Sequence, residues 1–108
     1  MVEAVNQRAT ILYDGAINRG TDVVKAMALG AHVVGIGRLQ CFGLAAAGQA
    51  GLVRVLELLE EEIRTTLGLM GVTCWSQLNK SYLQRVSPIS TADVLSTFPL
   101  LNLDDEGY

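Results

Sequence analysis

The sequence predicts an α/β fold organised around one strand-helix-strand unit. Three observations support this prediction. A short apolar strand at 11–13 runs into a glycine-bearing turn at 14–20. A helical segment at 21–29 follows and is stopped by Gly30. A second apolar run at 32–36 then ends in Gly37 and Arg38. Because the second run is nearly unbroken in apolar character, we expect a strand covered on both faces.

The two strands of such a unit must be parallel, because the crossover helix returns the chain to its starting edge. Both glycine-bearing turns therefore lie at the same end of the sheet. Thr21 is a good N-cap, and Asp22 at the first helical position favours the positive end of the helix dipole. Backbone N–H groups, this helix N-terminus and Arg38 converge at that end, and the combination suits a phosphate group.

After Arg38 the small-residue segment 43–48 predicts a short helix, and a long helix begins at Ala50 and is ended by Gly71. The long helix carries an apolar stripe that favours a crossover helix covering a sheet over a coiled-coil zipper. On its other face Glu60 and Arg64 can form a weak surface pair. One more short helix is predicted at 75–84, with Ser76 as its cap. The stripe consists of Leu52, Leu56, Leu59, Ile63, Leu67 and Met70.

Composition bounds the chain to one domain, with residues 1–87 as its structured part and 88–108 as an extended, acidic-ended tail. Half of the residues are hydrophobic and the mean hydropathy is +0.34. With only 18% charged residues, this surplus indicates faces meant for burial against something else. A strand count of two is also too small for a barrel or a doubly wound sheet.

Charge and cysteine usage exclude several classes of protein. The net charge is −3 without a basic cluster, which argues against a nucleic-acid partner. Cys41 and Cys74 lack ligand-like spacing, so we expect a reduced, cytoplasmic setting and no metal site. We expect no signal peptide, since Met1-Val2-Glu3 leads straight into a polar helix. We also expect no transmembrane segment, since Gln49, Arg54 and Glu57 interrupt the apolar stretches.

Two motifs carry a resemblance to a known family. They are Asp14-Gly15-Ala16 followed by Gly20-Thr21-Asp22, and Gly35-Ile36-Gly37-Arg38 followed by a small-residue segment at 43–52. Over residues 2–85 the chain resembles the FMN-dependent α-hydroxy acid oxidases and dehydrogenases. The resemblance implies part of a (β/α)₈ TIM barrel, namely strands seven and eight with their helices and a C-terminal tail. It also implies FMN as cofactor and the oxidation of 2-hydroxy acids to 2-oxo acids.

By this resemblance, Asp14 accepts hydrogen bonds from the ribityl hydroxyls of FMN, while Gly15, Gly37 and Arg38 bind its phosphate. The family usually has glycine where Ala16 stands and a phosphate-binding arginine where Asn18 stands. Taken singly, Asp14 could be an Asx-turn residue and the glycines simple turn residues. The predicted cofactor-binding residues are Asp14, Gly15, Ala16, Asn18, Gly37 and Arg38.

No catalytic residue is predicted in this chain, because the family's catalytic histidine and arginines lie upstream of the part that it resembles. His32 is expected to be a strand-end residue at the opposite end of the barrel. Three hypotheses remain open: the C-terminal part of an FMN-dependent oxidoreductase that is inactive alone, a non-catalytic phosphate-binding, flavin-binding or self-associating fragment, or a different FMN barrel such as an isomerase. The segment after Arg38 argues against the third. The expected partner is the remaining N-terminal barrel segment or a second copy, joined through open sheet edges.

Overall fold

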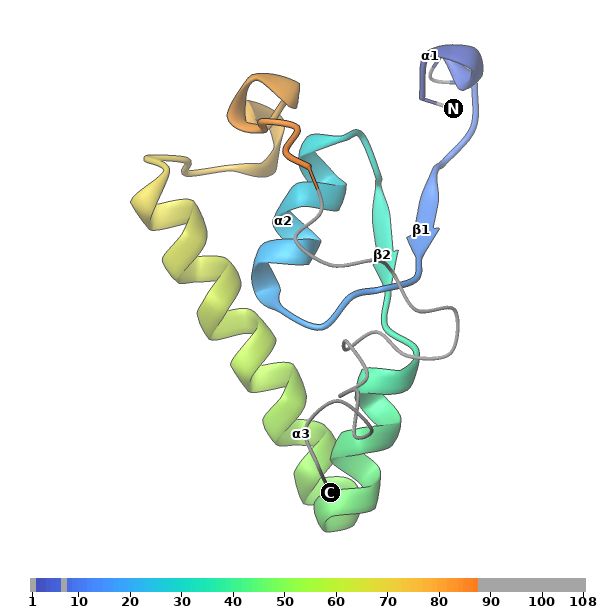
Figure 1. Cartoon of the computed structure of the whole chain (residues 1–108), viewed down its shortest axis with the longest axis vertical. Coiled ribbons are helices and arrows are strands. Elements are labelled where there is room, and N and C mark those ends of the chain that lie inside the picture. Colours follow the sequence, from blue (N-terminus) through green and yellow to red (C-terminus); the bar gives the residue numbers. More distant parts are fainter. Residues whose placement is uncertain (1, 7, 88–108) are drawn as a thin grey trace, which may run out of the picture.

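The computed structural model describes residues 2–6 and 8–87. The helix α1 (Val2–Val5) leads to the strand β1 (Leu12–Asp14), the helix α2 (Gly20–Ala28), the strand β2 (Val33–Gly35) and the long helix α3 (Arg38–Leu69) (Figure 1). Two 3₁₀ turns follow, η1 (Trp75–Gln77) and η2 (Lys80–Tyr82). The tail predicted at 88–108 lies outside the described residues.

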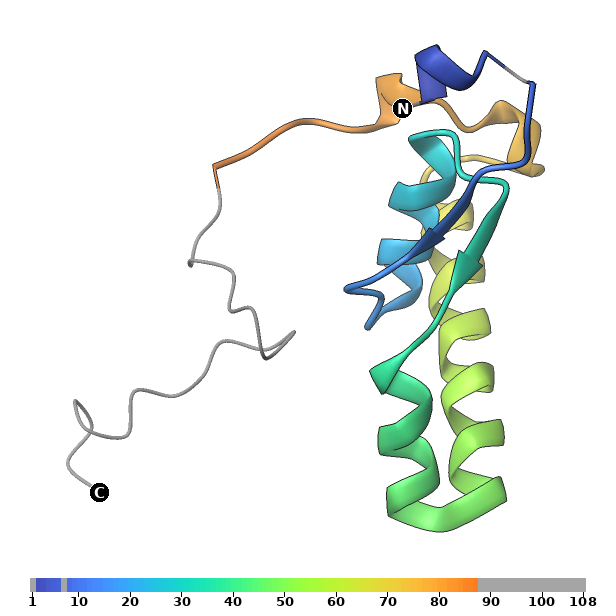
Figure 2. The ribbon, with the colours of Figure 1, turned by 90° about the vertical axis from the view of Figure 1, so that its right-hand side faces the viewer.

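The strands β1 and β2 pair in parallel and lie side by side (Figure 2), which confirms the prediction from the crossover helix. Leu12 pairs with Val33, and Asp14 pairs with Gly35. At the other end of the pair, the backbone N–H of His32 donates to the carbonyl oxygen of Ile11 at 2.8 Å. The loops that follow Asp14 and Gly35 therefore leave the sheet at the same end.

A glycine follows the C-cap residue of both principal helices, α2 and α3, and stops each helix as predicted. Gly30 has a φ of +101° and Gly71 a φ of +69°, the left-handed conformation that glycine adopts without steric cost. Ala31 donates its N–H to the carbonyl of Ala26, and Val72 donates to that of Leu67. These bonds across the last turn satisfy carbonyls that would otherwise lack helical partners.

The helix α3 is interrupted at Ala47 and Gly48, whose backbone angles are not helical. It is therefore a hairpin of two arms, 38–46 and 49–69, which lie side by side in Figures 1 and 2. The first arm begins at Arg38, five residues before the short helix predicted from sequence. A Cβ on Gly51 would overlap the carbonyl oxygen of Gly43, so both arms need glycine where they meet. In length and apolar composition α3 could cross a membrane, contrary to the sequence-based expectation, but the break folds it back on itself.

The hydrophobic core lies between α2, the second arm of α3 and the segment that follows it. Its buried members are Val24, Ala28, Val72 and Leu78. Ile63, Leu67 and Met70 of the predicted stripe pack against them, so the stripe covers α2, whereas a hollow separates it from β2. The strands are poorly covered, since Leu12 is 70% exposed and Val33 is 47% exposed. The apolar surplus noted in the sequence is thus largely on the surface.

Two of the predicted helices differ from those in the structure. The helix α2 begins at Gly20 with Arg19 at the N-cap position, so Thr21 is not the cap and Asp22 is the third helical residue. The helix predicted at 75–84 is two separate turns, because Leu78 and Asn79 have extended backbone. Ser76 lies inside the first turn, and the side chain of Asn79 caps the second by accepting from the N–H of Ser81.

Candidate functional site

A hollow of about 220 Å³ lies at the ends of β1 and β2 where the two loops leave the sheet. Residues 14–18, from the loop between β1 and α2, form one wall. Residues 37–39, from the first turn of α3, form the other. The structure brings all of the predicted cofactor-binding residues to this hollow: Asp14, Gly15, Ala16, Asn18, Gly37 and Arg38.

The wall after β1 contains two consecutive residues with positive φ. Gly15 has a φ of +122°, and Ala16 has a φ of +56°. The left-handed conformation brings Cβ too close to the following carbonyl oxygen, which costs an alanine roughly 1–2 kcal/mol. This wall therefore favours glycine at position 16, and Ala16 occupies it under strain.

The wall after β2 is the start of a helix, which the sequence reasoning did not predict. Gly37 is the N-cap of α3, and Arg38 is its first residue. The first N–H groups of a helix point away from its body, and together with the macrodipole they favour an anion. Arg38 itself lines the hollow on the same side. A signal was present in the sequence, since the residues from 38 to 47 include neither proline nor a β-branched residue.

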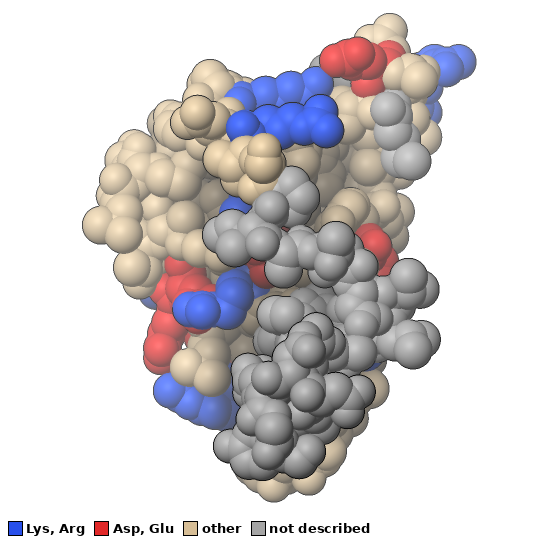
Figure 3. Space-filling view, viewed as in Figure 1, with Lys and Arg blue, Asp and Glu red and all other residues tan. Residues whose placement is uncertain are grey.

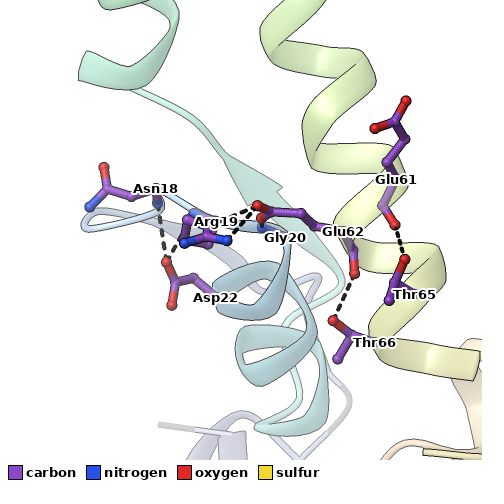
Figure 4. Close-up of polar contacts among 8 residues, drawn as sticks. All are labelled: Asn18, Arg19, Gly20, Asp22, Glu61, Glu62, Thr65 and Thr66. Atoms are coloured by element: carbon purple, nitrogen blue, oxygen red, sulfur yellow. Dashed lines mark hydrogen bonds and ion pairs between the residues drawn. The ribbon is translucent and has the colours of Figure 1, made fainter. Parts of the chain in front are cut away.

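The N-terminus of α2 does not join the site, and this part of the sequence prediction is wrong. Asp22 accepts hydrogen bonds from the N–H groups of Asn18 at 3.2 Å and Arg19 at 3.1 Å. Glu62, from the second arm of α3, accepts from the N–H of Gly20 at 2.7 Å (Figure 4). Two carboxylates thus take the donors that were expected to face a phosphate.

Glu62 also binds the guanidinium of Arg19, at 2.7 Å through Nη2 and 2.8 Å through Nε. The hydrogen bond from Arg19 and that from the Gly20 N–H lower the pKa of the Glu62 carboxyl. Arg19 is consequently turned towards α3 (Figure 4), and it does not line the hollow. The sequence could not reveal this contact, because Arg19 and Glu62 lie 43 residues apart and on different elements.

His32 lies at the other end of the strand pair. Its Nδ1 accepts a hydrogen bond at 3.0 Å from the N–H of Ile11. The ring thereby closes the start of the sheet, which confirms the prediction of a strand-end residue. Among residues 2–6 and 8–87, no cluster of His, Cys, Asp or Glu side chains is suited to a metal ion.

The hollow fits the tail of a flavin mononucleotide. Its volume is below the roughly 300–1,000 Å³ of sites that enclose a whole drug-sized ligand, so only the phosphate and adjoining atoms could enter. A Cβ on Gly15 would meet no atom within 4 Å beyond its chain neighbours, and a Cβ on Gly37 would lie 4.0 Å from Oδ1 of Asp14. Backbone N–H groups and Arg38 suit the phosphate, while the Asp14 carboxylate suits hydroxyl donors.

Comparison with known proteins identifies the family. A family model described as "FMN-dependent dehydrogenase" matches residues 1–85. The chain belongs to the FMN-dependent dehydrogenase family. It is 45% identical to an L-lactate oxidase of Nostoc sp. over 83 residues, 77% of this chain and 23% of that protein. It is 39% identical to glycolate oxidase 1 of Zea mays over 99 residues, 92% of this chain and 26% of that protein. The cofactor of the family is FMN.

Solved structures support the same family assignment. A crystal structure of the monotopic membrane protein (S)-mandelate dehydrogenase matches with a TM-score of 0.72 and 40% identity, over 77% of this chain and 22% of that one. A flavocytochrome b2 mutant matches with a TM-score of 0.72 and 28% identity, over 98% of this chain and 27% of that one. These are TIM-barrel flavoenzymes, and the chain spans about a quarter of their length. Since the matches include a membrane-associated enzyme, the family does not fix the compartment, and a cytoplasmic location stays a prediction.

Proposed function

We propose that this chain supplies the FMN-phosphate side, strands seven and eight, of a TIM-barrel flavoenzyme that oxidises 2-hydroxy acids to 2-oxo acids. One observation carries the proposal. Two loops that follow two neighbouring parallel strands form a single hollow, with Gly15 on one wall and Gly37 and Arg38 on the other. Phosphate sites of TIM barrels are frequently built by the loops after strands seven and eight. The relatives named as lactate oxidase and glycolate oxidase support the substrate class.

In this proposal the residues of the chain bind and orient the cofactor. Gly15 and Gly37 donate backbone N–H groups to the phosphate, and Arg38 adds a charge-assisted hydrogen bond. Asp14 accepts hydrogen bonds from the ribityl hydroxyls. FMN, when bound, supplies the acceptor for the hydride equivalent removed from the substrate. The hollow is too small for the flavin ring, which would be held by polypeptide that completes the barrel.

A second candidate function is flavin binding without turnover. His32 favours it, because the single histidine of the sequence is at the opposite end of the strands and its Nδ1 is engaged by Ile11. A general base must come within hydrogen-bond reach of the proton that it removes. In this proposal the chain takes part in the oxidation only together with a segment that brings the base.

Reconstitution tests the proposal. The full 108-residue chain is expressed together with the part of maize glycolate oxidase 1 that it does not match, and oxidation of glycolate and lactate is assayed with added FMN. We expect restored oxidation, because the two polypeptides together supply both the base and the phosphate site. FMN binding without oxidation would favour the second candidate. A complex that binds no FMN would contradict both.

A further inference from the structure

The loop from β1 to α2, which forms the first wall of the phosphate hollow, is held from behind by two carboxylates (Figure 4). The backbone N–H groups of Asn18 and Arg19 donate to the carboxylate of Asp22. The next N–H along the chain, that of Gly20, donates to Glu62. Because Asn18 itself lines the hollow, this series of hydrogen bonds begins within the wall.

The two carboxylates come from different helices. Asp22 belongs to α2, so it moves together with the loop that it holds. Glu62 belongs to the second arm of α3 and reaches the loop from outside. A Cβ on Gly20 would lie 2.5 Å from the Cβ of Glu62, so α2 begins in direct contact with this side chain. Glu62 therefore fixes the end of the loop relative to α3.

The same helix carries the other wall of the hollow. Gly37 is the N-cap of α3, and Arg38 is its first residue. The two arms of α3 pack closely, since a Cβ on Gly43 would lie 2.8 Å from Cγ2 of Val55. Through this hairpin Glu62 connects the loop after β1 to the wall that faces it.

Strand pairing alone does not fix the distance between the walls. The paired residues end at Asp14 and Gly35, and most of each wall lies beyond them. A binding site needs its groups held within about 0.5 Å by further contacts from the residues behind them. Glu62 supplies such contacts to Gly20 and Arg19.

Glu62 differs in its partners from the other three glutamates of this arm. Its side chain is 31% exposed and bonds to the start of α2. The side chains of the other three are more than half exposed and pair with arginines of the arm itself. Figure 3 shows acidic and basic side chains adjoining at the left of the face, the side on which this arm runs in Figure 1. The pairs are Arg54 with Glu57 and Glu61, and Arg64 with Glu60, the last as predicted from the sequence.

We propose that Glu62 is a positioning residue for the phosphate of FMN. It does not line the hollow, and it acts by setting the distance between the loop after β1 and the start of α3. This inference rests on the proposed function and adds to it a residue that the cofactor does not touch.

The sign of the effect separates positioning from direct electrostatics. A carboxylate repels a phosphate, and loss of the Glu62 carboxylate would also release the guanidinium of Arg19. Direct electrostatics therefore predicts that FMN binds more tightly once the charge of Glu62 is removed. Positioning predicts weaker binding, because the two walls lose their spacing.

Titration of the full chain with FMN and with riboflavin, which lacks the phosphate, tests the inference. Glu62→Gln loses the charge but keeps an oxygen that can accept from the N–H of Gly20, and Glu62→Ala removes both. The controls are Glu60→Gln and Glu60→Ala, which make the same changes at an exposed residue of the same helix. Circular dichroism at neutral pH establishes that each variant keeps its helices.

We expect Glu62→Ala to raise the dissociation constant for FMN by about tenfold and Glu62→Gln to raise it by less. Riboflavin should bind both as it binds the unchanged chain, and the Glu60 variants should keep the FMN affinity. FMN binding by Glu62→Ala that is unchanged or tighter would overturn the inference and leave the proposed function intact.

An equal loss of FMN and riboflavin affinity in Glu62→Ala would also overturn the inference, because Glu62 would then support the fold without a specific effect on the phosphate. An unchanged chain that binds no FMN would contradict the proposed function, and the inference with it.

Discussion

Ala16 carries backbone strain in the wall of the phosphate hollow, with a φ of +56°. Glycine adopts this conformation without the steric cost of a Cβ. Replacement by glycine also adds freedom to the unfolded chain, which offsets part of the gain. We therefore predict that Ala16→Gly raises the free energy of unfolding by about 0.5–1 kcal/mol. Urea denaturation of the full chain measures it.

The matched control is Ala45→Gly, in the first arm of α3. There the backbone is helical, so glycine should destabilise the chain by about 0.5–1 kcal/mol. Opposite signs for the two substitutions are the expected outcome. Destabilisation at both positions would show that the loop holding Ala16 does not require a left-handed residue.

Asn18 lines the phosphate hollow at a position where the resemblance to the family led us to expect arginine. A guanidinium there can donate a charge-assisted hydrogen bond to phosphate. We predict that Asn18→Arg lowers the dissociation constant for FMN by about tenfold, equivalent to about 1.4 kcal/mol. Riboflavin, which lacks the phosphate, should bind as before. Gln84→Arg adds the same charge at an exposed residue outside the hollow and should leave the FMN affinity unchanged.

Between elements, Glu62 fixes the start of α2 against α3 through Gly20 and Arg19. Because these hydrogen bonds lower the pKa of Glu62 in the folded chain, its ionised form stabilises the fold. The contribution is fully present above the unfolded pKa of about 4.3 and is lost as the pH falls through the lower folded value. We predict that Glu62→Gln is less stable than the unchanged chain at neutral pH, and that the difference shrinks below about pH 4.

Thermal unfolding followed across this pH range measures the effect. Glu60→Gln is the control, since Glu60 pairs with Arg64 on the exposed face of the same helix. An exposed pair of this kind contributes little to stability. A stability difference for Glu62→Gln that does not change with pH would contradict a stabilising role for the ionised Glu62 carboxylate.

Gly20 of α2 packs directly against α3. A Cβ at this position would lie 2.5 Å from the Cβ of Glu62 and 2.7 Å from the backbone nitrogen of Ile63. We predict that Gly20→Ala destabilises the chain by about 1–3 kcal/mol, because the two helices must separate. Gly68→Ala is the control. No atom lies within 4 Å of the Cβ that it would add, so the gain in helix propensity should make it neutral or stabilising.

At the scale of the whole molecule, the parts that the sequence predicted correctly depend on local patterns. Gly30 and Gly71 ended their helices, and the crossover made β1 and β2 parallel. That parallel arrangement brought the two loops to one end and every predicted cofactor-binding residue to one hollow. The residue types at the ends of short helices and strands were enough to predict the helix ends, the parallel pairing and the common hollow.

The errors involve contacts between residues far apart in the chain. Glu62 closes the N-terminus of α2, which the local sequence had suggested for phosphate. The helix start that lines the hollow is that of α3, at Gly37 and Arg38. Leu78 is drawn into the core with extended backbone, so the helix predicted at 75–84 breaks into two turns. Packing between distant segments decided each case, and no periodicity in the sequence encodes it.

Amide chemical shifts of the full chain, followed during titration with FMN, inorganic phosphate and riboflavin, test the central claim most directly. FMN and phosphate should both shift the amide signals of Gly15, Gly37 and Arg38, because these line the hollow that we assign to the phosphate. Riboflavin should leave them in place. Identical responses to FMN and riboflavin, or FMN-dependent shifts confined to residues elsewhere in the chain, would contradict the account.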